Sequence, residues 1–331
     1  MRGYLLQVSV IIPCFNADRW ITKVLDSCLM QGPLLGEVVV VDDGSTDDST
    51  IIVQRYVQEH PDRIRLLRNP GKGGNAARVF GFTQSRFDLI QWLDADDYLC
   101  EGKFSAQVRH LQGNVDIVYS DWIERFHNND DRIVRDVERI MNSDESLLLS
   151  LAADRWSVPA NYLMTRGLAE RTVAADGWMP GRRIAQDREF FTIAAVLSRR
   201  AAYVPGLFSI YNRRPHGSVS GMDFAERLSL QMPLDARLRA FVLDADLCTG
   251  EKPLCMRRLN THCINAVFYN WGVMPQFFFW PWQVSLSLLH WKKRVIYPLL
   301  YFAAMVGYCR YRLRLDGVSG TMQRNRSDDR S

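Results

Sequence analysis

The chain has 331 residues, enough for one large domain with a smaller appendage. Hydrophobic residues make up 47% and charged residues 24%, a globular composition that excludes disordered and fibrous classes. The net charge of +4 is too small to indicate a nucleic-acid partner, and we expect none. Seven scattered cysteines without a CxxC pair favour a reducing compartment, the cytoplasm, over a disulfide framework.

The first residues, MRGYLLQVSVIIP, do not resemble a signal peptide, because their short apolar run leads directly into a strand-like segment. No stretch reaches the roughly 18 uninterrupted apolar residues of a membrane-spanning helix. The nearest candidate, residues 295–308, is too short and contains Pro298. We therefore expect no spanning helix.

Strands and helices alternate over the first 120 or so residues. Strands are predicted over residues 8–12, 37–41, 64–67, 88–93 and 115–119. Helices are predicted over residues 17–31, after a cap at Ser45 or Thr46, and over residues 75–85. Repeated βα units imply an α/β fold with a doubly wound, mostly parallel sheet.

The second half of the chain mixes element types. Residues 121–222 contain a predicted helix at 187–197 and a predicted strand pair at 201–212. From about residue 223 to 316 the pattern is helical and rich in aromatic residues. The polar tail, residues 317–331, is predicted to be disordered.

Two adjacent carboxylates, Asp42 and Asp43, follow the buried strand predicted over residues 37–41. Ligands of open α/β sheets bind at the carboxyl ends of strands, where these side chains could accept hydrogen bonds from a base or a ribose. A helix-capping turn explains the same residues equally well, because Asp, Gly and Ser are common turn residues. The pair alone leaves both interpretations open.

Asp94, Asp96 and Asp97 also come directly after an apolar strand. Carboxylates this close repel one another, and a hard divalent cation with oxygen ligands, Mg²⁺ or Mn²⁺, is their natural partner. Such a cation bridges readily to a diphosphate. A solvated acidic loop is the competing interpretation, which the preceding apolar strand disfavours.

A glycine-rich loop, residues 69–75, precedes the third predicted helix. Its glycines let the backbone approach a phosphate, and Lys72 supplies positive charge. The loop matches neither the P-loop nor the GxGxxG fingerprint, so by itself it is weak evidence for phosphate binding.

Four segments, in this order, resemble the family 2 glycosyltransferases: VSVIIPCFN, VVVVDDGSTDDS, NPGKGGNAARVFG and LIQWLDADD. The resemblance covers residues 8–120 and implies the Rossmann-like GT-A fold, with LDADD as its DxD motif. It implies a site for a nucleotide-sugar donor, most simply a UDP-sugar, and a Mn²⁺ or Mg²⁺ cofactor held by Asp94 and Asp96. The implied donor-binding residues are Pro13, Asn16, Asp42, Asp43, Lys72, Arg78 and Asp94.

The resemblance also supplies a candidate for the catalytic base. Gln186-Asp187 lies where the family usually has a Glu-Asp pair before a helix, so Asp187 is expected to take the proton from the acceptor hydroxyl. Gln186 departs from the usual Glu. An acid stabilised by a helix N-terminus is the plainer interpretation of Asp187, and the motifs of the first half favour catalysis over it.

Residues 211–220, YNRRPHGSVS, resemble the family's closing segment, in which a His or an Arg approaches the diphosphate. Arg214 and His216 both suit this role, and His216 could also ligate the metal. The sequence does not separate the two residues, and a flexible basic loop is the alternative interpretation.

Together these features predict an inverting glycosyltransferase that moves a sugar to the hydroxyl of a glycan or lipid-linked acceptor, in cell-surface polysaccharide or glycolipid synthesis. The implied organisation is a GT-A catalytic domain at 1–222, with a nucleotide-sugar half at 1–120 and an acceptor half at 121–222, followed by a helical region at 223–316. A GT-A scaffold without activity is one rival, which the intact Asp94, Asp96 and Asp187 disfavour. A nucleotidyltransferase is another, but PCFN replaces the glycine-rich basic signature expected after its first strand.

Residues 277–314 combine aromatic residues, clustered Lys and Arg, and the apolar run at 295–308. Such a segment suits an interfacial helix on anionic lipid. Packing against the catalytic domain or a second subunit explains it equally well. We predict peripheral attachment to the cytoplasmic face of the membrane, weakened by salt because basic residues contribute to it.

Overall fold

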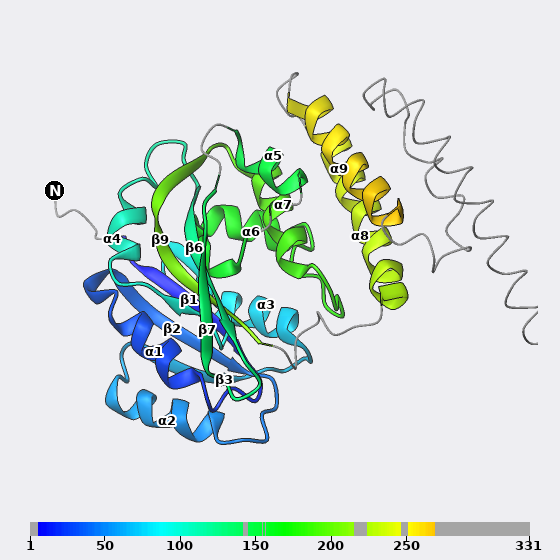
Figure 1. The fold of residues 1–331 in the computed structure, drawn as a ribbon. Coiled ribbons are helices and arrows are strands. Elements are labelled where there is room, and N and C mark those ends of the chain that lie inside the picture. Colours follow the sequence, from blue (N-terminus) through cyan, green and yellow to red (C-terminus); the bar gives the residue numbers. More distant parts are fainter. Residues whose placement is uncertain are drawn as a thin grey trace, which may run out of the picture. The chain divides into compact units, whose positions relative to one another are not determined.

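The computed structural model describes residues 6–141, 145–153, 155, 157–214, 224–245 and 251–268 (Figure 1). Contacts divide the chain into two compact units, Met1–Leu247 and Cys248–Ser331. The second unit contributes helix α9 (Glu251–Phe268) to the described residues. His216, the segment at 277–314 and the tail at 317–331 lie outside the described residues, so their predicted roles remain predictions.

The first half of the large unit is a parallel sheet with strand order β3-β2-β1-β4. Its elements are β1 (Val8–Cys14), α1 (Ile21–Leu29), β2 (Leu35–Asp42), α2 (Ser49–Glu59), β3 (Ile64–Arg68), α3 (Gly74–Gln84) and β4 (Leu89–Trp92). Each strand and helix predicted in this half is present. The strand order, in which the chain moves outward from β1 in both directions, confirms the doubly wound arrangement.

Helix α2 begins later than the sequence suggested, at Ser49 rather than after a cap at Ser45 or Thr46. The carboxylate of Asp42 accepts hydrogen bonds from the backbone N–H groups of Gly44 and Ser45, which fixes a turn there. Asp47 then accepts a bond from the backbone of Ser49 at 3.0 Å. Local side-chain bonds of this kind compete with helix formation and delay its start.

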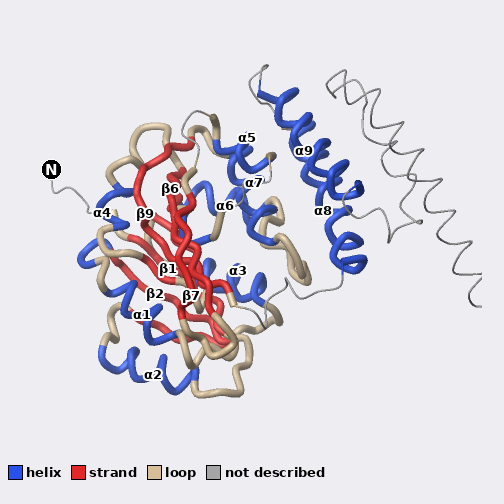
Figure 2. Tube along the Cα trace, in the orientation of Figure 1, coloured by secondary structure: helices blue, strands red, loops and turns tan. Residues whose placement is uncertain are grey.

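The second half adds strands of mixed direction, giving nine strands in the order β3-β2-β1-β4-β8-β6-β9-β5, with β7 paired to β6. Its strands are β5 (Tyr98–Leu99), β6 (Ile117–His127), β7 (Ile133–Arg139), β8 (Leu163–Thr165) and β9 (Ala201–Arg213). Its helices are α4 (Lys103–Val108), α5 (Leu147–Ala152), α6 (Arg166–Ala174), α7 (Gln186–Leu197) and α8 (Phe224–Asp244). Figure 2 shows the strands as one central layer, with α1 and α2 on one side and α3, α6 and α7 on the other.

The predicted strand pair at 201–212 is wrong, because β9 is one long strand. It runs parallel to β6 over most of its length, with register shifts near its middle. Pro205 and Gly206, which suggest a turn in the sequence, instead lie inside the strand, where Gly206 adopts φ 138°. The strand bends at this irregular position instead of reversing direction, as strands often do at a glycine.

The core of the parallel half is built on β2, whose eight residues are all buried. Helix α3 packs closely on this sheet because Gly81 has no side chain. A Cβ atom at Gly81 would lie 2.8 Å from Ile11 and 2.9 Å from Val41. The close contact sets α3, which carries Arg78, against the carboxyl-terminal parts of β1 and β2.

An aromatic cluster fastens α7 to β4. The rings of Trp178 and Phe190 stack with centroids 4.2 Å apart, and Trp92 meets both edge-to-face. All three side chains are fully buried. Stacked and edge-on aromatic pairs stabilise by more than their area alone, so this cluster fixes where α7 begins.

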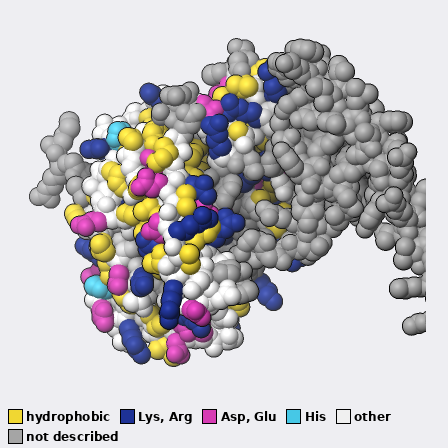
Figure 3. Space-filling model, viewed as in Figure 1, with side chains coloured by type: hydrophobic (Ala, Val, Ile, Leu, Met, Phe, Trp, Pro, Cys, Tyr) yellow, Lys and Arg dark blue, Asp and Glu magenta, His cyan; other side chains and the backbone are white. Residues whose placement is uncertain are grey.

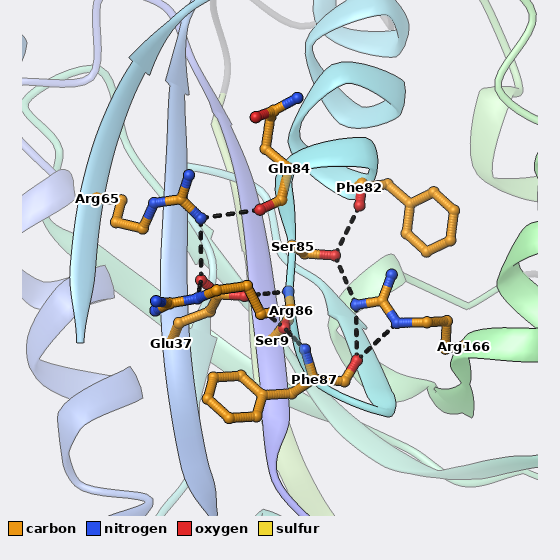
Figure 4. Close-up of polar contacts among 9 residues, drawn as sticks. All are labelled: Ser9, Glu37, Arg65, Phe82, Gln84, Ser85, Arg86, Phe87 and Arg166. Carbon is orange, nitrogen blue, oxygen red and sulfur yellow. Dashed lines mark hydrogen bonds and ion pairs between the residues drawn. The ribbon is translucent and has the colours of Figure 1, made fainter. Parts of the chain in front are cut away.

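A buried carboxylate, Glu37, organises the amino-terminal end of the parallel strands (Figure 4). It accepts hydrogen bonds from Ser9 at 2.8 Å, Arg86 at 2.9 Å and Arg65 at 3.2 Å. A buried charge is tolerated only with such partners. The cluster ties the loop before β4 to β1 and β2, at the end of the strands opposite to the site described next.

Among the described residues, no helix combines the length and apolar character needed to cross a membrane.

Candidate active site

A cleft of about 370 Å³ opens beside the carboxyl ends of β1 and β4. Seven of the residues predicted from the sequence line it: Pro13, Asn16, Asp43, Arg78, Asp94, Asp96 and Arg214. They come from five parts of the chain, the ends of β1, β2, β4 and β9 and helix α3, which the fold brings together. Three other predicted residues, Asp42, Lys72 and Asp187, are outside this lining.

The two carboxylates at the end of β2 have different surroundings. Asp42 is buried, and its carboxylate accepts hydrogen bonds from the backbone of Gly44 and Ser45, which makes it part of a turn that lies before the start of α2. Asp43 faces the cleft and accepts hydrogen bonds from Asn69 at 2.6 Å and from the Gly73 backbone at 2.8 Å. Asp43 therefore holds the glycine-rich loop against the cleft, while Lys72 in that loop points into solvent.

The DxD carboxylates each meet an arginine in the cleft. Asp94 lies 2.5 Å from Arg78, and Asp96 lies 2.7 Å from Arg214. Burial, together with the negative charge of Asp94, raises the pKa of Asp96 above its ordinary value. Two acids that repel one another in a half-buried cleft form a place where a cation would be favourable.

Asp97, the third acid, does not face the cleft. It is buried, and it accepts a hydrogen bond from the backbone of Asn212 at 3.0 Å. Burial and the charges of Asp96 and Asp94 raise its pKa well above the ordinary value. Asp97 therefore joins the DxD turn to β9 rather than lining the donor cleft.

The residues present fit a hard divalent cation. Asp94 and Asp96 are partly exposed to the cleft and offer carboxylate oxygens, the ligands that Mg²⁺ and Mn²⁺ prefer. Within the described ranges no three His, Cys, Asp or Glu side chains converge as a complete metal site. A cation held by two carboxylates needs further oxygens, which a bound diphosphate can supply.

Arg78 connects the DxD motif to the start of α7. Besides its contact with Asp94, its guanidinium donates to Gln186 at 3.2 Å and to Asn75 at 3.1 Å. It also lies 4.5 Å from the ring centroid of Trp178, a cation–π distance. This one buried cation therefore links the acidic cleft, the glycine-rich loop and the helix that carries Asp187.

Asp187 is the second residue of α7 and is half-buried. Burial and the charge of Asp94 raise its pKa to about 7, while Arg78 opposes the shift. A carboxylate with a pKa near neutrality is a far stronger base than an ordinary one, and its basic form is still present at neutral pH. The side chain thus has the electrostatics that general-base catalysis requires.

Helix α8 holds the beginning of α7 from the other side. Arg188 lies 2.6 Å from Asp235 of α8, and both side chains are buried. Glu189 pairs with Arg182 at 2.8 Å and also with Arg237 of α8. Both residues that directly follow Asp187 are therefore fixed by ion pairs, which leaves the backbone of Asp187 little freedom to move.

Sequence reasoning missed several residues of the site. Trp20 falls within the helix predicted over residues 17–31, but α1 begins only at Ile21, and Trp20 lines the cleft. The guanidinium of Arg214 lies 3.7 Å from its ring centroid. Phe15 also lines the cleft and is 59% exposed. In the sequence, Phe15 lies in the PCFN segment between Pro13 and Asn16, two residues predicted to bind the donor, and this position could have identified it.

Two further residues act at the back of the DxD turn. The Asn212 side chain donates to the backbone oxygen of Asp96 at 2.6 Å and meets Nε2 of His127 at 2.8 Å. The ring of His127 lies edge-on to Trp20, with centroids 5.8 Å apart. No local sequence signal identifies these residues, because the contacts depend on the pairing of β6 with β9.

Comparison with known proteins extends these observations. The family model described as glycosyl transferase family 2 matches residues 9–183, more than half of the chain. An uncharacterized glycosyltransferase of Haemophilus influenzae is 32% identical over 108 residues, which are 32% of this chain and 43% of that protein. The minor teichoic acid biosynthesis protein GgaB of Bacillus subtilis is 33% identical over 124 residues, 35% of this chain and 14% of that protein. The matched part is thus less than half the length of either relative.

Solved structures share the fold. TarS 1–349 of S. aureus, in complex with UDP-GlcNAc, superposes with a TM-score of 0.62 at 19% identity, covering 92% of this chain and 88% of that one. Mannosyltransferase PcManGT from Pyrobaculum calidifontis, in complex with GDP-Man and Mn²⁺, gives 0.56 at 20% identity, covering 93% and 88%. The GT-A architecture expected from the motifs is confirmed, and the chain belongs to glycosyl transferase family 2.

Proposed function

We propose that this chain is an inverting, metal-dependent glycosyltransferase that moves a sugar from a UDP-sugar to an acceptor hydroxyl, in cell-surface polysaccharide or glycolipid synthesis. The observation that carries the proposal is the single connected arrangement of Asp94, Arg78 and Gln186-Asp187. This arrangement links Asp94, one of the two carboxylates proposed to hold a cation, to the helix start that carries Asp187, the proposed general base. TarS was solved in complex with UDP-GlcNAc, which supports the choice of donor. GgaB is named as a teichoic acid biosynthesis protein, which supports the choice of pathway class.

The donor is assigned to the cleft at the carboxyl ends of β1 and β4. Asp43 and Asn16 present polar atoms there, and the exposed ring of Phe15 offers a face on which the nucleotide base of the donor can stack. Arg214 supplies positive charge for the diphosphate, as His216 is also proposed to do. Residues 121–222 are assigned to the acceptor side.

The metal is assigned to Asp94 and Asp96, with His216 as a further candidate ligand. When bound, Mg²⁺ or Mn²⁺ would neutralise charge on the leaving nucleoside diphosphate. Arg78 and Arg214 each pair with one of the two acids, so a cation that enters with the donor would share these carboxylates with the arginines.

Asp187 is assigned the proton transfer. It removes the proton of the acceptor hydroxyl while that oxygen forms a bond to the anomeric carbon of the sugar. The bond from the anomeric carbon to the diphosphate oxygen breaks on the opposite face, so the configuration inverts. The buried ion pairs of Arg188 and Glu189 keep the carboxylate in place for this step.

A GT-A scaffold without activity and a nucleotidyltransferase are the rival assignments. A scaffold has no need of a carboxylate with a pKa near 7 beside two further acids. A nucleotidyltransferase needs a glycine-rich basic turn after its first strand, where this chain has PCFN.

A thermal-shift screen of nucleotide sugars, with and without Mn²⁺, tests donor binding. UDP-sugars should raise the melting temperature of the wild-type chain in a Mn²⁺-dependent way. Asp96→Asn should lose the Mn²⁺-dependent part, because the cation loses a charged ligand, while Asp62→Asn at an exposed turn should keep it. If no nucleotide sugar changed the melting temperature of the wild type, the assignment of the cleft would be wrong.

A further inference from the structure

Strands β6, β7 and β9 have two faces with different neighbours. One face carries His127 and Asn212, which contact Trp20 and the DxD turn and so belong to the donor cleft. The pairing of β6 with β7 and β9 places the following side chains together on the other face: Glu124, Phe126, Arg135, Arg139, Tyr211 and Arg213. We call this second face the arginine face.

The arginine face comes close to the DxD turn at Tyr211, because the backbone N–H of the next residue, Asn212, donates to Asp97. Arg78 links Asp94 of the same turn to Gln186, the residue before Asp187. Burial, together with the charges of Asp97 and Asp187, raises the pKa of the Tyr211 hydroxyl. Residues two apart on a strand are separated by about 7 Å on the same face, so Arg213 comes next after Tyr211. An acceptor whose hydroxyl reaches Asp187 would therefore extend over this face.

Two guanidinium groups share one aromatic ring on this face. Arg135 of β7 lies 4.3 Å from the ring centroid of Phe126, and Arg213 of β9 lies 5.7 Å from it. Arg135 is exposed. Within the described part of the chain, its guanidinium contacts this ring and not a carboxylate. The ring orients both cations without neutralising either of them.

Positive charge on the arginine face exceeds negative charge. Glu124 is buried and pairs with Arg213 at 2.8 Å and with Arg139. Burial alone would raise the pKa of Glu124, but its hydrogen bonds with the two arginines lower it. One carboxylate therefore faces three arginines, and Lys and Arg side chains gather near the centre of the described surface in Figure 3.

The positive and negative side chains of β7 lie on opposite faces of the strand. Protection of an exposed edge strand from pairing with other chains does not explain this separation, because charges of either sign on either face provide it. Here Arg135 and Arg139 lie on the arginine face, whereas Asp136 and Glu138 alternate with them on the other. The segregation points to recognition of an anion.

We infer that the arginine face binds an anionic group of the acceptor, a phosphate or a carboxylate one sugar or polyol unit away from the reacting hydroxyl. The inference rests on the proposed function, since it assigns the acceptor side of the same site. Arginine suits this task because its planar fork matches both oxyanions in a bidentate manner. Phe126 holds Arg135 and Arg213 in position, and Glu124 fixes the guanidinium groups of Arg139 and Arg213.

Binding of labelled polymers to the full chain, by fluorescence anisotropy at low salt, tests the inference. The probes are poly(glycerol phosphate), oligogalacturonate and neutral dextran. Wild type should bind at least one anionic probe and not dextran, and the preferred probe identifies the group as phosphate or carboxylate. The double variant Arg135→Gln/Arg213→Gln should weaken that binding at least tenfold. Arg135→Gln alone, at an exposed position, should weaken it about threefold and serves if the double variant does not fold.

The matched control is Arg55→Gln/Arg109→Gln, which removes the same charge from two exposed positions elsewhere in the unit. It should change the affinity less than twofold. Equal losses in control and test variants, unchanged binding in the test variants, or no anionic probe bound by the wild type would each overturn the inference. Binding of UDP with Mn²⁺ is measured on the same wild-type sample. Its absence would remove the proposed function, whereas intact UDP binding without arginine-dependent polymer binding would remove only this inference.

Discussion

Asp187 illustrates how surroundings turn an ordinary residue into a candidate base. Its position in the first turn of a helix would normally favour its charged form. Burial and the nearby charge of Asp94 outweigh this and raise its pKa to about 7. The sequence identified the residue through the Gln186-Asp187 pair, but its electrostatics follow from the approach of α7 to the end of β4.

Replacement of Asp187 by Asn should leave donor binding largely intact and lower kcat by on the order of 10²–10⁴, the usual contribution of a general base. The amide keeps the shape of the side chain but cannot accept the proton. Steady-state kinetics and calorimetry of UDP binding measure the two effects separately. Asp62→Asn should change neither, and a lost donor affinity with normal kcat in Asp187→Asn would move the residue to the binding site.

The pH dependence of turnover should carry the same signature. The base acts only when deprotonated, so a raised pKa moves the loss of activity upward in pH. We expect kcat/KM for the acceptor to fall about tenfold per pH unit below about 7, the pKa of Asp187 in the free chain. An acidic limb near pH 4, the ordinary range of an aspartate, would show that burial does not act on this group.

Individual site residues differ in how far sequence alone could reveal them. Asp94, Asp96 and Asp43 follow apolar strands, and the family resemblance predicted them at a ligand site, although the Asp42-Asp43 pair alone left a turn as an equal interpretation. Trp20 was included in the helix predicted over residues 17–31, because a periodic pattern does not show which residue starts the helix. Asn212 and His127 meet only through pairing of strands distant in sequence, which no local pattern reports.

At the scale of elements, the parallel half was predictable because its strands are short, mostly apolar segments that are bounded by turn residues. The long β9 was not, since its Pro205 and Gly206 are also what a hairpin turn contains. The short β5 and β8 have two and three residues, too few for any periodicity to appear in the sequence. They exist because neighbouring strands offer them hydrogen bonds.

The packing of α3 on the sheet gives a prediction at this scale. Gly81→Ala should lower the free energy of unfolding by roughly 1–3 kcal/mol, because the new methyl group would overlap Ile11 and Val41. Denaturant unfolding monitored by circular dichroism measures the change. Gly167→Ala in α6 is the matched control, since a Cβ there meets only Arg171 at 3.8 Å. It should be neutral or stabilise by up to about 1 kcal/mol, and equal destabilisation by both would contradict the packing argument.

At the scale of the molecule, the proposals assign the donor and the acceptor to opposite faces of strands β6, β7 and β9. The strand register places Asn212 and His127 on one face of β6 and β9, and Tyr211 and Arg213 on the other. A shift of these strands would therefore move residues of both proposed sites. The family resemblance predicted the order of these parts along the chain, whereas their division between two faces required the strand register.

The segment at 277–314 gives a prediction that rests on the sequence. The full chain should sediment with liposomes that contain anionic lipid at low salt, and less so at high salt. A chain that ends near residue 275 should stay in the supernatant. Equal recovery of both chains in the supernatant would leave packing against protein as the explanation for this aromatic and basic segment.

Glycosyl transfer is tested most directly by the product released from a UDP-sugar. The wild-type chain with Mn²⁺ should release UDP, EDTA should abolish the release, and Asp187→Asn should slow it by on the order of 10²–10⁴. A second reaction with added pyrophosphate covers the rival, because a nucleotidyltransferase would convert a UDP-sugar and pyrophosphate to UTP and a sugar 1-phosphate. Chromatography distinguishes UDP from UTP, and formation of UTP, or no release of UDP from any donor that binds the cleft, would contradict the assignment of this chain as a glycosyltransferase.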